Sequence, residues 1–570
     1  REYAEGMQSI EQYKDLLGAS GDSSYLNLNW EVVPMIPKFV DVIVGGLTNQ
    51  EYKIKCTAID QLSKDKRTED RLKKLTAMEL KEFHNEMAGL TGMPFDKGND
   101  ELPESNDELD LYMSLNYKQM TEIAMEEGIE LTFYLNDWEE VKKRISRDLV
   151  VLNIAASKTD VENGKLTIRY VDPNHLVTSH SSRPDFKNIE HAGEIIYMSI
   201  HDLKRLAGDE FTEDEYMEIA RSNGGKYGNP KNLGKGSNYY NSYELHEYDT
   251  YKVAVLDGLY KTVDDLHYEK KENKYGGYSI NKKTKTYKEP KNSKQQRTKI
   301  KTSVENIYKG KWIVGTDYIF DYGLATNILR PKSNLSKAML PYSIYAPNIL
   351  NMNNKSLVER MIPFADQIQL CHLKIQHLMS KAKPKGSAIE LGAIENVGKG
   401  DGGTFTPIEV QDIYQQTGNL YYRAQQDDGT PIQSMPIQEL GGGIGGALQE
   451  LIAIYQYNLQ MLRDVTGINE ARDASQPDKE SLVGVQKMAL LASNNATRWI
   501  NQALLSITQN TAKSIALRVQ DLVQYKGTYK GYVQAIGEYN MKAIEVSKDV
   551  TMADYGIMIE PLPDEEQKVL

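Results

Sequence analysis

The segment at residues 354–386, NKSLVERMIPFADQIQLCHLKIQHLMSKAKPKG, limits the choice of fold more than any other part of this chain. Between Met361 and Ser380 the only formal charges are Asp366 and Lys374, which is too little charge for a helix surrounded by water. Three glutamines and two histidines in the same stretch make it too polar for a bilayer. We therefore expect a long helix that faces protein or a shared, wet space.

A second weakly charged helix is predicted at 447–467, ALQELIAIYQYNLQMLRDVTG, with few charges between Glu450 and Arg463. Short strands around a glycine-rich turn lie between the two helices, beginning at Ser387. A charged, proline-containing loop follows the second helix, and a helical pattern of about forty residues then runs to Tyr525. The order is helix, small β module, helix, charged loop, long helix.

The first half of the chain mixes both kinds of secondary structure, which indicates an α+β fold. Residues 29–48 predict a helix entered through prolines, and 107–128 and 136–150 predict two more. Strand-like stretches rich in β-branched and aromatic residues follow, separated by Gly, Asn, Pro and Lys. The apolar face expected for the first helix consists of Phe39, Val40, Ile43, Val44 and Leu47.

Length and composition exclude several classes of protein. With 570 residues the chain can bury two to four cores without disulfides, and its two cysteines, Cys56 and Cys371, are expected to be core thiols. The sequence predicts neither a membrane-spanning helix nor a signal peptide. Because it opens on Arg1 and stops where a helical pattern begins, we expect it to be part of a longer protein.

Charge is distributed unevenly along the chain. The net charge of −12 argues against a protein that neutralises phosphates over its whole surface. Residues 270–301, however, contain twelve Lys or Arg against Glu272 and Glu289. Such a segment is either a solvated insertion or a patch for nucleic acid or an acidic neighbour.

No catalytic or cofactor-binding pattern is found. Gly441–Gly446, GGGIGG, matches a dinucleotide fingerprint in spelling, but it lacks the preceding buried strand and the later acidic residue. Gly228–Ser237 has the wrong spacing for a phosphate-binding loop, and the nine histidines show no metal-ligand spacing. We expect no cofactor, no metal and no enzymatic activity.

The order of segments resembles that of the portal proteins of tailed bacteriophages. Stretches such as WEVVPMIPKFVDVIVGGLTNQEYKIKC, LTIRYVDPNHLVTSHSSRPDFKNIEHAGE, KGKWIVGTDYIFDYG, LPYSIYAPN, KSLVERMIPFADQIQ and TGINEARDASQPDKESLVGVQK are similar to the portal of crAss-like phages, and the resemblance covers essentially the whole chain. It implies a portal-type fold with an α/β wing, a paired α-helical stem, a small β-containing clip and a long wing helix, assembled as a ring with a dodecamer expected.

The resemblance also implies a division of the chain. It assigns 1–353 to the wing, with the Lys-rich insertion at 270–301, and 354–382 to the first stem helix. The clip spans 383–446 and the second stem helix 447–466. Residues 467–480 form a tunnel loop projecting into the channel, and 481–570 contain the long wing helix and the start of a crown region that lies mostly beyond the chain.

Three groups of residues are predicted to carry the function. The tunnel loop would offer mixed charge to DNA through Asn469, Glu470, Arg472, Asp473, Gln476, Asp478 and Lys479. Sparse cations at the stem–clip junction would centre the duplex, namely Lys381, Lys383 and Lys385. Neighbouring stem helices would share a seam of Met361, Ala365, Ile368, His372, Ile375 and Met379, while amides and histidines face wet or inter-helix space.

A portal ring implies a structural role. It would occupy one capsid vertex of the virion after assembly in the host cytoplasm, and pass double-stranded DNA during packaging and ejection. Its partners would be further copies of itself, double-stranded DNA, terminase, a head–tail adaptor or ring protein and the major capsid protein, with no membrane. The alternative from another class is a nucleic-acid-binding accessory protein that uses the Lys-rich insertion. A Tyr-rich carbohydrate- or protein-binding module is a third hypothesis, which leaves the weakly charged helices unexplained.

Overall fold

The chain divides into two compact units, each built from two separated stretches of sequence. Unit 1 contains residues 1–39 and 360–489, and unit 2 contains 40–359 and 490–570. Both helices and strands in sheets are present, which confirms the predicted α+β class. The computed structural model describes residues 1–17, 28–91, 103, 105–162, 165–220, 252–272, 277–288, 297–350, 352–381, 387–389, 397–400, 402–417, 421, 425, 437–439, 444–470, 472, 483–524 and 555–561.

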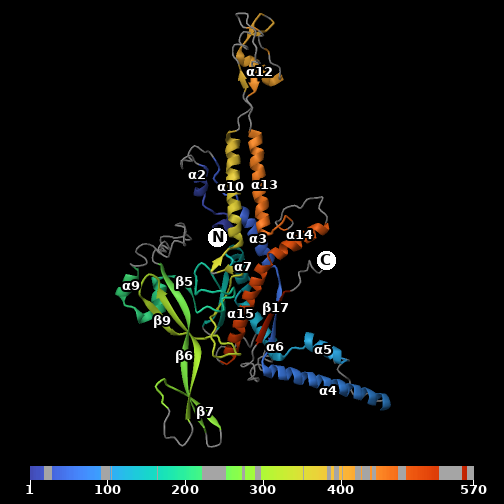
Figure 1. The fold of residues 1–570 in the computed structure, drawn as a ribbon, viewed down its shortest axis with the longest axis vertical. Helices are drawn as coiled ribbons and strands as arrows, with labels where there is room; N and C mark the ends of the chain where they lie inside the picture. Colours follow the sequence, from blue (N-terminus) through green and yellow to red (C-terminus); the bar gives the residue numbers. More distant parts are fainter. Residues whose placement is uncertain are drawn as a thin grey trace. The chain divides into compact units, whose positions relative to one another are not determined.

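Unit 1 is organised around two long helices and the small β module between them. These are α10 (Leu357–Lys381) and α13 (Ile444–Thr466), drawn in yellow and orange in Figure 1. Strand β13 (Ser387–Ile389) pairs antiparallel with β16 (Ile437–Glu439), so the end of α10 and the start of α13 lead to the same two-stranded ladder. The prediction of two helices joined by a β module is confirmed for these elements.

The rest of the module and the N-terminal segment complete unit 1. Strands β14 (Val397–Gly398) and β15 (Thr404–Phe405) form a hairpin that leads into α12 (Pro407–Thr417). Helices α1 (Glu2–Glu5) and α2 (Glu11–Leu17) precede α3 (Met35–Thr48), whose first residues belong to this unit. Residues 1–39 were predicted to belong to the wing, but the structure groups them with α13 and most of α10.

Unit 2 contains three main sheets. The largest has the strand order β4 (Leu176–Thr178), β5 (His191–Ser199), β6 (Lys252–Glu272), β8 (Arg297–Ile313) and β9 (Ile319–Leu324), with β7 (Tyr278–Lys283) on the outer half of β6. A second sheet has the order β10 (Tyr342–Tyr345), β2 (Ala155–Glu162), β3 (Lys165–Val171). Strands β1 (Tyr52–Ala58) and β17 (Tyr555–Pro561) form a third. A two-residue pair, β11 (Ile349–Leu350) with β12 (Asn353–Asn354), lies just before α10.

Helix α15 (Arg498–Gln524) is the organising helix of unit 2, because it packs on β2, β10 and β17 and on two further helices, α6 (Met120–Leu135) and α7 (Trp138–Val151). Its contact face is fully buried, and includes Ile507, Ile515 and Val519. The other helices are α4 (Gln61–Thr91), α5 (Asn106–Leu115), α8 (Ile200–Ala207) with the 3₁₀ turn η1 (Gly208–Glu210), α9 (Glu213–Ile219) and α14 (Val483–Ala496), whose first residues belong to unit 1.

A buried ion network joins the two larger sheets of unit 2. The Glu194 carboxylate on β5 is 5% exposed and accepts two hydrogen bonds of 2.7 Å from Arg169 on β3. It also accepts one of 2.9 Å from the hydroxyl of Tyr342 on β10, and Lys158 Nζ on β2 lies 3.6 Å away. Because several donors surround this buried charge, the network fixes how the strands meet.

The structure departs from the predicted helices at two places. The segment 107–128 is not one helix, since α5 ends at Leu115 and α6 begins at Met120, so this prediction was wrong. The forty-residue helix after the charged loop is likewise broken at Thr497 into α14 and α15. At the break the Thr497 hydroxyl donates to the Asn494 carbonyl at 3.3 Å, a side-chain hydrogen bond that competes with the regular helical one.

Other local predictions are confirmed. Of the apolar face expected for α3, Phe39, Val40, Ile43 and Leu47 are buried and Val44 is half-buried. Both cysteines are free and buried, and burial raises the pKa of the Cys56 thiol to about 12. Among the helices that the structure describes, none combines the length and apolarity that crossing a membrane requires.

Candidate functional site

The polar residues of α10 are held by the N-terminal segment of the same unit. Asp366 Oδ1 accepts hydrogen bonds from the hydroxyls of Tyr3, at 2.8 Å, and Tyr13, at 2.6 Å. Gln369 accepts from the Val33 backbone N–H at 2.8 Å and donates to the Glu31 carbonyl at 3.0 Å. We call these contacts, made by residues 3–33 on α10, the N-terminal clasp.

The clasp continues toward the C-terminal end of α10. Gln376 accepts from the Asn29 backbone N–H at 3.2 Å, and its amide nitrogen is hydrogen-bonded to His372 Nε2 at 2.9 Å. Burial raises the pKa values of Tyr3 and Tyr13, and the adjacent Asp366 carboxylate raises them further. The expectation that the amides of this helix face wet or inter-helix space is therefore wrong for Gln369, which is buried and binds backbone groups of its own chain, whereas Gln376 is half-buried.

The predicted seam on α10 is split into two parts. Met361, Ala365 and Ile368 are 0%, 5% and 0% exposed, so their side chains are already covered by the chain itself. His372 and Ile375 are half-buried, and Met379 is 63% exposed. Only the C-terminal part of the predicted seam is therefore accessible to another molecule.

Helix α13 has buried and accessible positions. Asn458, Leu462 and Thr466 recur every four residues and are buried. Ile454, one turn before Asn458 on the same row, is 46% exposed, and Tyr457, to the side of that row, is 62% exposed, so the helix becomes accessible toward its N-terminal end. The predicted seam did not include Ile454 and Tyr457, although two apolar residues at helical spacing in a weakly charged helix could be recognised in the sequence.

The β module has its own small structure beside this pair of helices. Helix α12 begins with a capping box, in which Glu409 accepts from the Thr406 N–H at 2.8 Å while Thr406 Oγ1 accepts from the Glu409 N–H at 3.4 Å. These hydrogen bonds, with the 3.0 Å ion pair to Lys399, lower the pKa of Glu409. Of the predicted junction cations, Lys381 ends α10, and Lys383 and Lys385 lie outside the described residues.

The start of the predicted tunnel loop is an ordered helix end. Gly467 has φ +71° and donates its N–H to the Arg463 carbonyl at 2.8 Å, which closes α13 with a left-handed residue. Ile468 is fully buried, and Arg463 forms an ion pair with Glu470. Both contacts anchor the loop where it leaves the helix.

The other loop residues are described only in part. The Arg472 N–H donates to the Asn469 carbonyl at 3.0 Å, and partial burial lowers the pKa of the Arg472 guanidinium. The structure thus brings together Arg463, Asn469, Glu470 and Arg472 at the end of α13. Four predicted residues lie outside the described part of the chain: Asp473, Gln476, Asp478 and Lys479.

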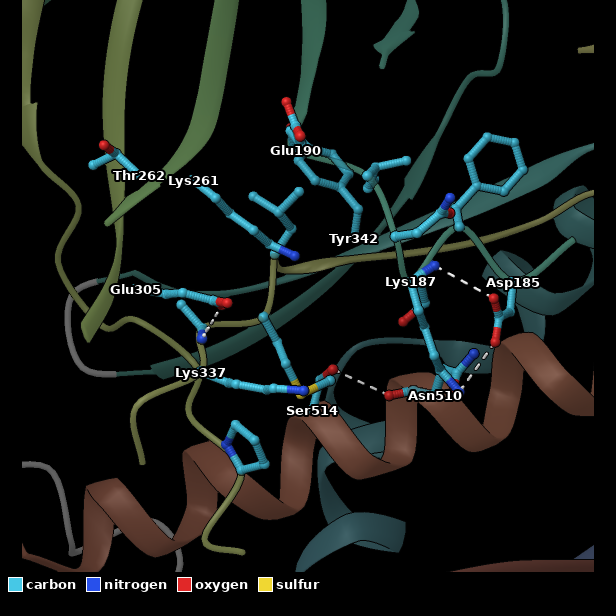
Figure 2. Close-up of a pocket in the computed structure, with 18 of the residues that line it drawn as sticks. Asp185, Lys187, Glu190, Lys261, Thr262, Glu305, Lys337, Tyr342, Asn510 and Ser514 are labelled. Carbon is cyan, nitrogen blue, oxygen red and sulfur yellow. Dashed lines mark hydrogen bonds and ion pairs between the residues drawn. The ribbon is translucent and has the colours of Figure 1, made fainter. Parts of the chain in front are cut away.

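Unit 2 contains a cavity of about 670 Å³ that the sequence did not indicate (Figure 2). Its wall combines residues 185–190, the β6 residues 261–263, the segment 337–343 and two side chains of α15. Figure 2 shows Lys261 reaching into the space, and partial burial lowers its pKa despite the opposing influence of Glu305. The Glu305 carboxylate itself accepts from the Ala338 N–H at 3.0 Å.

Two of the polar side chains that line this cavity have partners close by in the chain. Ser514 donates its hydroxyl to the Asn510 carbonyl within α15, and Lys187 is paired with Asp185. No nucleophile hydrogen-bonded to a general base is found among its lining residues. In the described part of the chain, no cluster of His, Cys, Asp and Glu could hold a metal ion.

Comparison with known proteins adds no relative. Models of known protein families find no match to this chain, and neither does a search of curated protein sequences. The features of this chain that bear on its function are the two long helices, the β module between them and the loop that follows α13.

Proposed function

We propose that this chain is the subunit of a phage portal, a ring at one capsid vertex of the virion that conducts double-stranded DNA during packaging and ejection. The portal-type fold and the dodecameric ring are part of the same proposal, as are docking of terminase and the head–tail adaptor and contact with the major capsid protein. The role is structural, so no covalent chemistry is required of the chain.

The observation that carries the proposal is the accessible apolar surface of the two long helices. Ile454, Tyr457 and Met379 are 46%, 62% and 63% exposed on helices that bear few charges. On α13, Ile454 and Tyr457 are three residues apart and therefore neighbours on the helix surface, and adjoining exposed apolar groups of this size fit a subunit contact. A heterologous contact through such a surface, repeated around an axis, generates a closed ring.

The start of the tunnel loop supports a channel that guides DNA without gripping it. Many phosphate-neutralising contacts would release counterions and act as a brake on movement. Arg463 is paired with Glu470 and Arg472 is partly buried, so neither cation is freely presented. The overall charge of −12 is consistent with weak attraction between the chain and phosphate.

The test is the mass and shape of the particle formed by the full chain. Native mass spectrometry and negative-stain imaging at micromolar concentration should show an annulus of about twelve copies with a central hole. A monodisperse monomer under these conditions contradicts the portal proposal.

A pair of charge substitutions tests whether the accessible helix face makes the ring. Ile454→Glu combined with Tyr457→Glu places two charges in the expected contact and should leave the protein as monomers or small oligomers. The matched control is Leu72→Glu with Leu80→Glu on α4, where the two leucines are 54% and 51% exposed. Rings that survive the α13 variant would show that this face is not the subunit contact.

A further inference from the structure

The Lys-rich segment forms the end of a long β-ribbon. Strand β5 pairs with β6 only as far as Tyr260, and β9 pairs with β8 only between Tyr308 and Trp312. Beyond these points β6 continues between β7 and β8 alone (Figure 1). We define the ribbon tip as residues 265–272, 278–288 and 297–303.

The ribbon tip is folded around one buried carboxylate. Glu269 is 3% exposed and accepts a hydrogen bond of 2.6 Å from the Tyr287 hydroxyl. Lys283 and Arg297 form ion pairs with it at 3.2 and 3.3 Å. Lys299 Nζ donates to the Tyr287 carbonyl at 3.1 Å, which ties the turn after β7 to β8. The tip is thus an ordered body.

The face of the tip opposite Glu269 is amphipathic and open. Cross-strand register places Lys270 beside Ile280, and Tyr268 beside Lys282 and Ile300. Tyr278 and Ile280 are 59% and 62% exposed, although lysines surround them. Lys270 Nζ lies 3.8 Å from the centre of the Tyr278 ring, a cation–π contact that keeps the ring at the surface.

Strand β7 offers a free edge next to this face. It pairs only with β6 in the described part of the sheet, so the backbone groups on its other side have no strand partner there. The exposed lysines 282, 285 and 288 have no acidic partner among the described residues of the tip. A strand laid along this edge would place its side chains beside Tyr278, Ile280 and Lys282.

We propose that the β7 edge of the ribbon tip is a docking site for an extended acidic segment of a partner protein, which adds to the sheet as a strand. Backbone hydrogen bonds along β7 supply affinity, and alternate side chains supply specificity. Because Lys270, Lys282, Tyr278 and Ile280 share one face, the contacting residues of the segment lie two apart along the strand. On that face, acidic residues that meet Lys270 and Lys282 follow apolar or aromatic residues that cover Tyr278 and Ile280.

Protection against aggregation and binding of duplex DNA are two roles that fit the chemistry of the tip less well. Lysines on an edge strand often protect it against aggregation. That role does not explain why Tyr278 and Ile280, which are 59% and 62% exposed, lie on the same strand. Duplex DNA is contacted mainly by polar and basic groups, which gives no use for these two apolar side chains. Binding measurements distinguish the three roles, and the docking proposal does not depend on the ring.

The test compares three fluorescent probes by anisotropy with the full chain. The first, called the alternating peptide, has about ten residues, with Glu alternating with Val or Tyr along one strand face and Ser or Thr on the other face. The second is polyglutamate of equal net charge, and the third is a short DNA duplex. The alternating peptide should bind at least about tenfold more tightly than polyglutamate, because only it can cover the apolar groups. Equal affinities for the two peptides, tightest binding of the duplex, or no binding of any probe would each overturn the proposal.

Three double variants separate charge from apolar contact. Tyr278→Ser with Ile280→Ser keeps the charge and should reduce affinity for the alternating peptide about tenfold, to the level of polyglutamate. Lys270→Gln with Lys282→Gln should weaken both peptides. The control, Lys53→Gln with Lys64→Gln, removes two exposed lysines elsewhere in unit 2 and should change neither. If the Tyr278→Ser, Ile280→Ser variant binds the alternating peptide as tightly as the native chain does, the tip is only an unspecific cationic patch and the docking proposal is wrong.

Discussion

Replacing Asp366 by Ala should release the N-terminal clasp from α10. The carboxylate accepts both tyrosine hydroxyls, at 2.8 Å from Tyr3 and 2.6 Å from Tyr13. All three residues belong to unit 1, so the perturbation tests contacts inside one compact body. Without the Asp366 carboxylate, the Tyr13 hydroxyl is left buried, whereas the Tyr3 hydroxyl keeps a second partner. The loss of stability of the clasp therefore comes mainly from Tyr13.

The magnitude follows from the burial of each tyrosine. Tyr13 is 1% exposed, and a buried donor that loses its partner costs about 1–3 kcal/mol. Tyr3 is half-buried and its hydroxyl also accepts from Gln12 at 2.9 Å, so it adds less than about 1 kcal/mol. We expect the free energy of opening the clasp to fall by about 2 kcal/mol, which is roughly a thirtyfold change in the opening equilibrium.

Hydrogen–deuterium exchange measures this opening directly. In the Asp366→Ala variant the amides of α2 (Glu11–Leu17) should exchange roughly thirtyfold faster, while amides of α15 in unit 2 keep their native rates. Asp464→Ala is the control, because this exposed acid on α13 accepts a hydrogen bond from Gln460 of the same helix and takes no part in the clasp. Unchanged exchange in α2 of the Asp366 variant would refute the argument that the carboxylate holds the clasp.

Three further predictions concern pH, the buried ion network and the end of α13. Burial and Asp366 raise the pKa values of Tyr3 and Tyr13 in the folded chain. The two tyrosines therefore stabilise the clasp fully below their unfolded-state pKa of about 10, and this contribution is lost as pH rises through their folded-state pKa values. The protection of α2 amides, corrected for intrinsic exchange, should be constant from about pH 6 to 9 and fall only above pH 10. Glu194→Gln removes the buried counter-charge of Arg169 and one of the two carboxylates near Lys158, which keeps Asp257 at 3.4 Å. The loss costs about 3–5 kcal/mol and should lower the calorimetric melting temperature of unit 2 by roughly 4–6 °C, whereas exposed Glu190→Gln should change it little. Gly467→Ala forces a Cβ into φ +71° and should destabilise the end of α13 by about 1 kcal/mol in exchange measurements, whereas Gly445→Ala inside the same helix should be neutral or stabilising.

Local pattern in the sequence was sufficient for α10, α13, most strands and the free cysteines. Apolar residues at helical spacing, such as Phe39, Val40 and Ile43, define a buried face whatever covers them. Gly467 ends α13 because glycine adopts a left-handed conformation at little cost. Such signals lie within one or two turns of chain, so a single sequence contains them completely.

Contacts between distant residues could not be predicted in this way. Nothing around Asp366 indicates that Tyr3, 363 residues earlier, is its hydrogen-bond partner. The pairing of β13 with β16, the Glu269 carboxylate that orders the Lys-rich tip, and the cavity beside Lys261 are of the same kind. Periodicity determines which face of an element is buried, but a partner depends on how the whole chain is folded, and that was decided only in the tertiary structure.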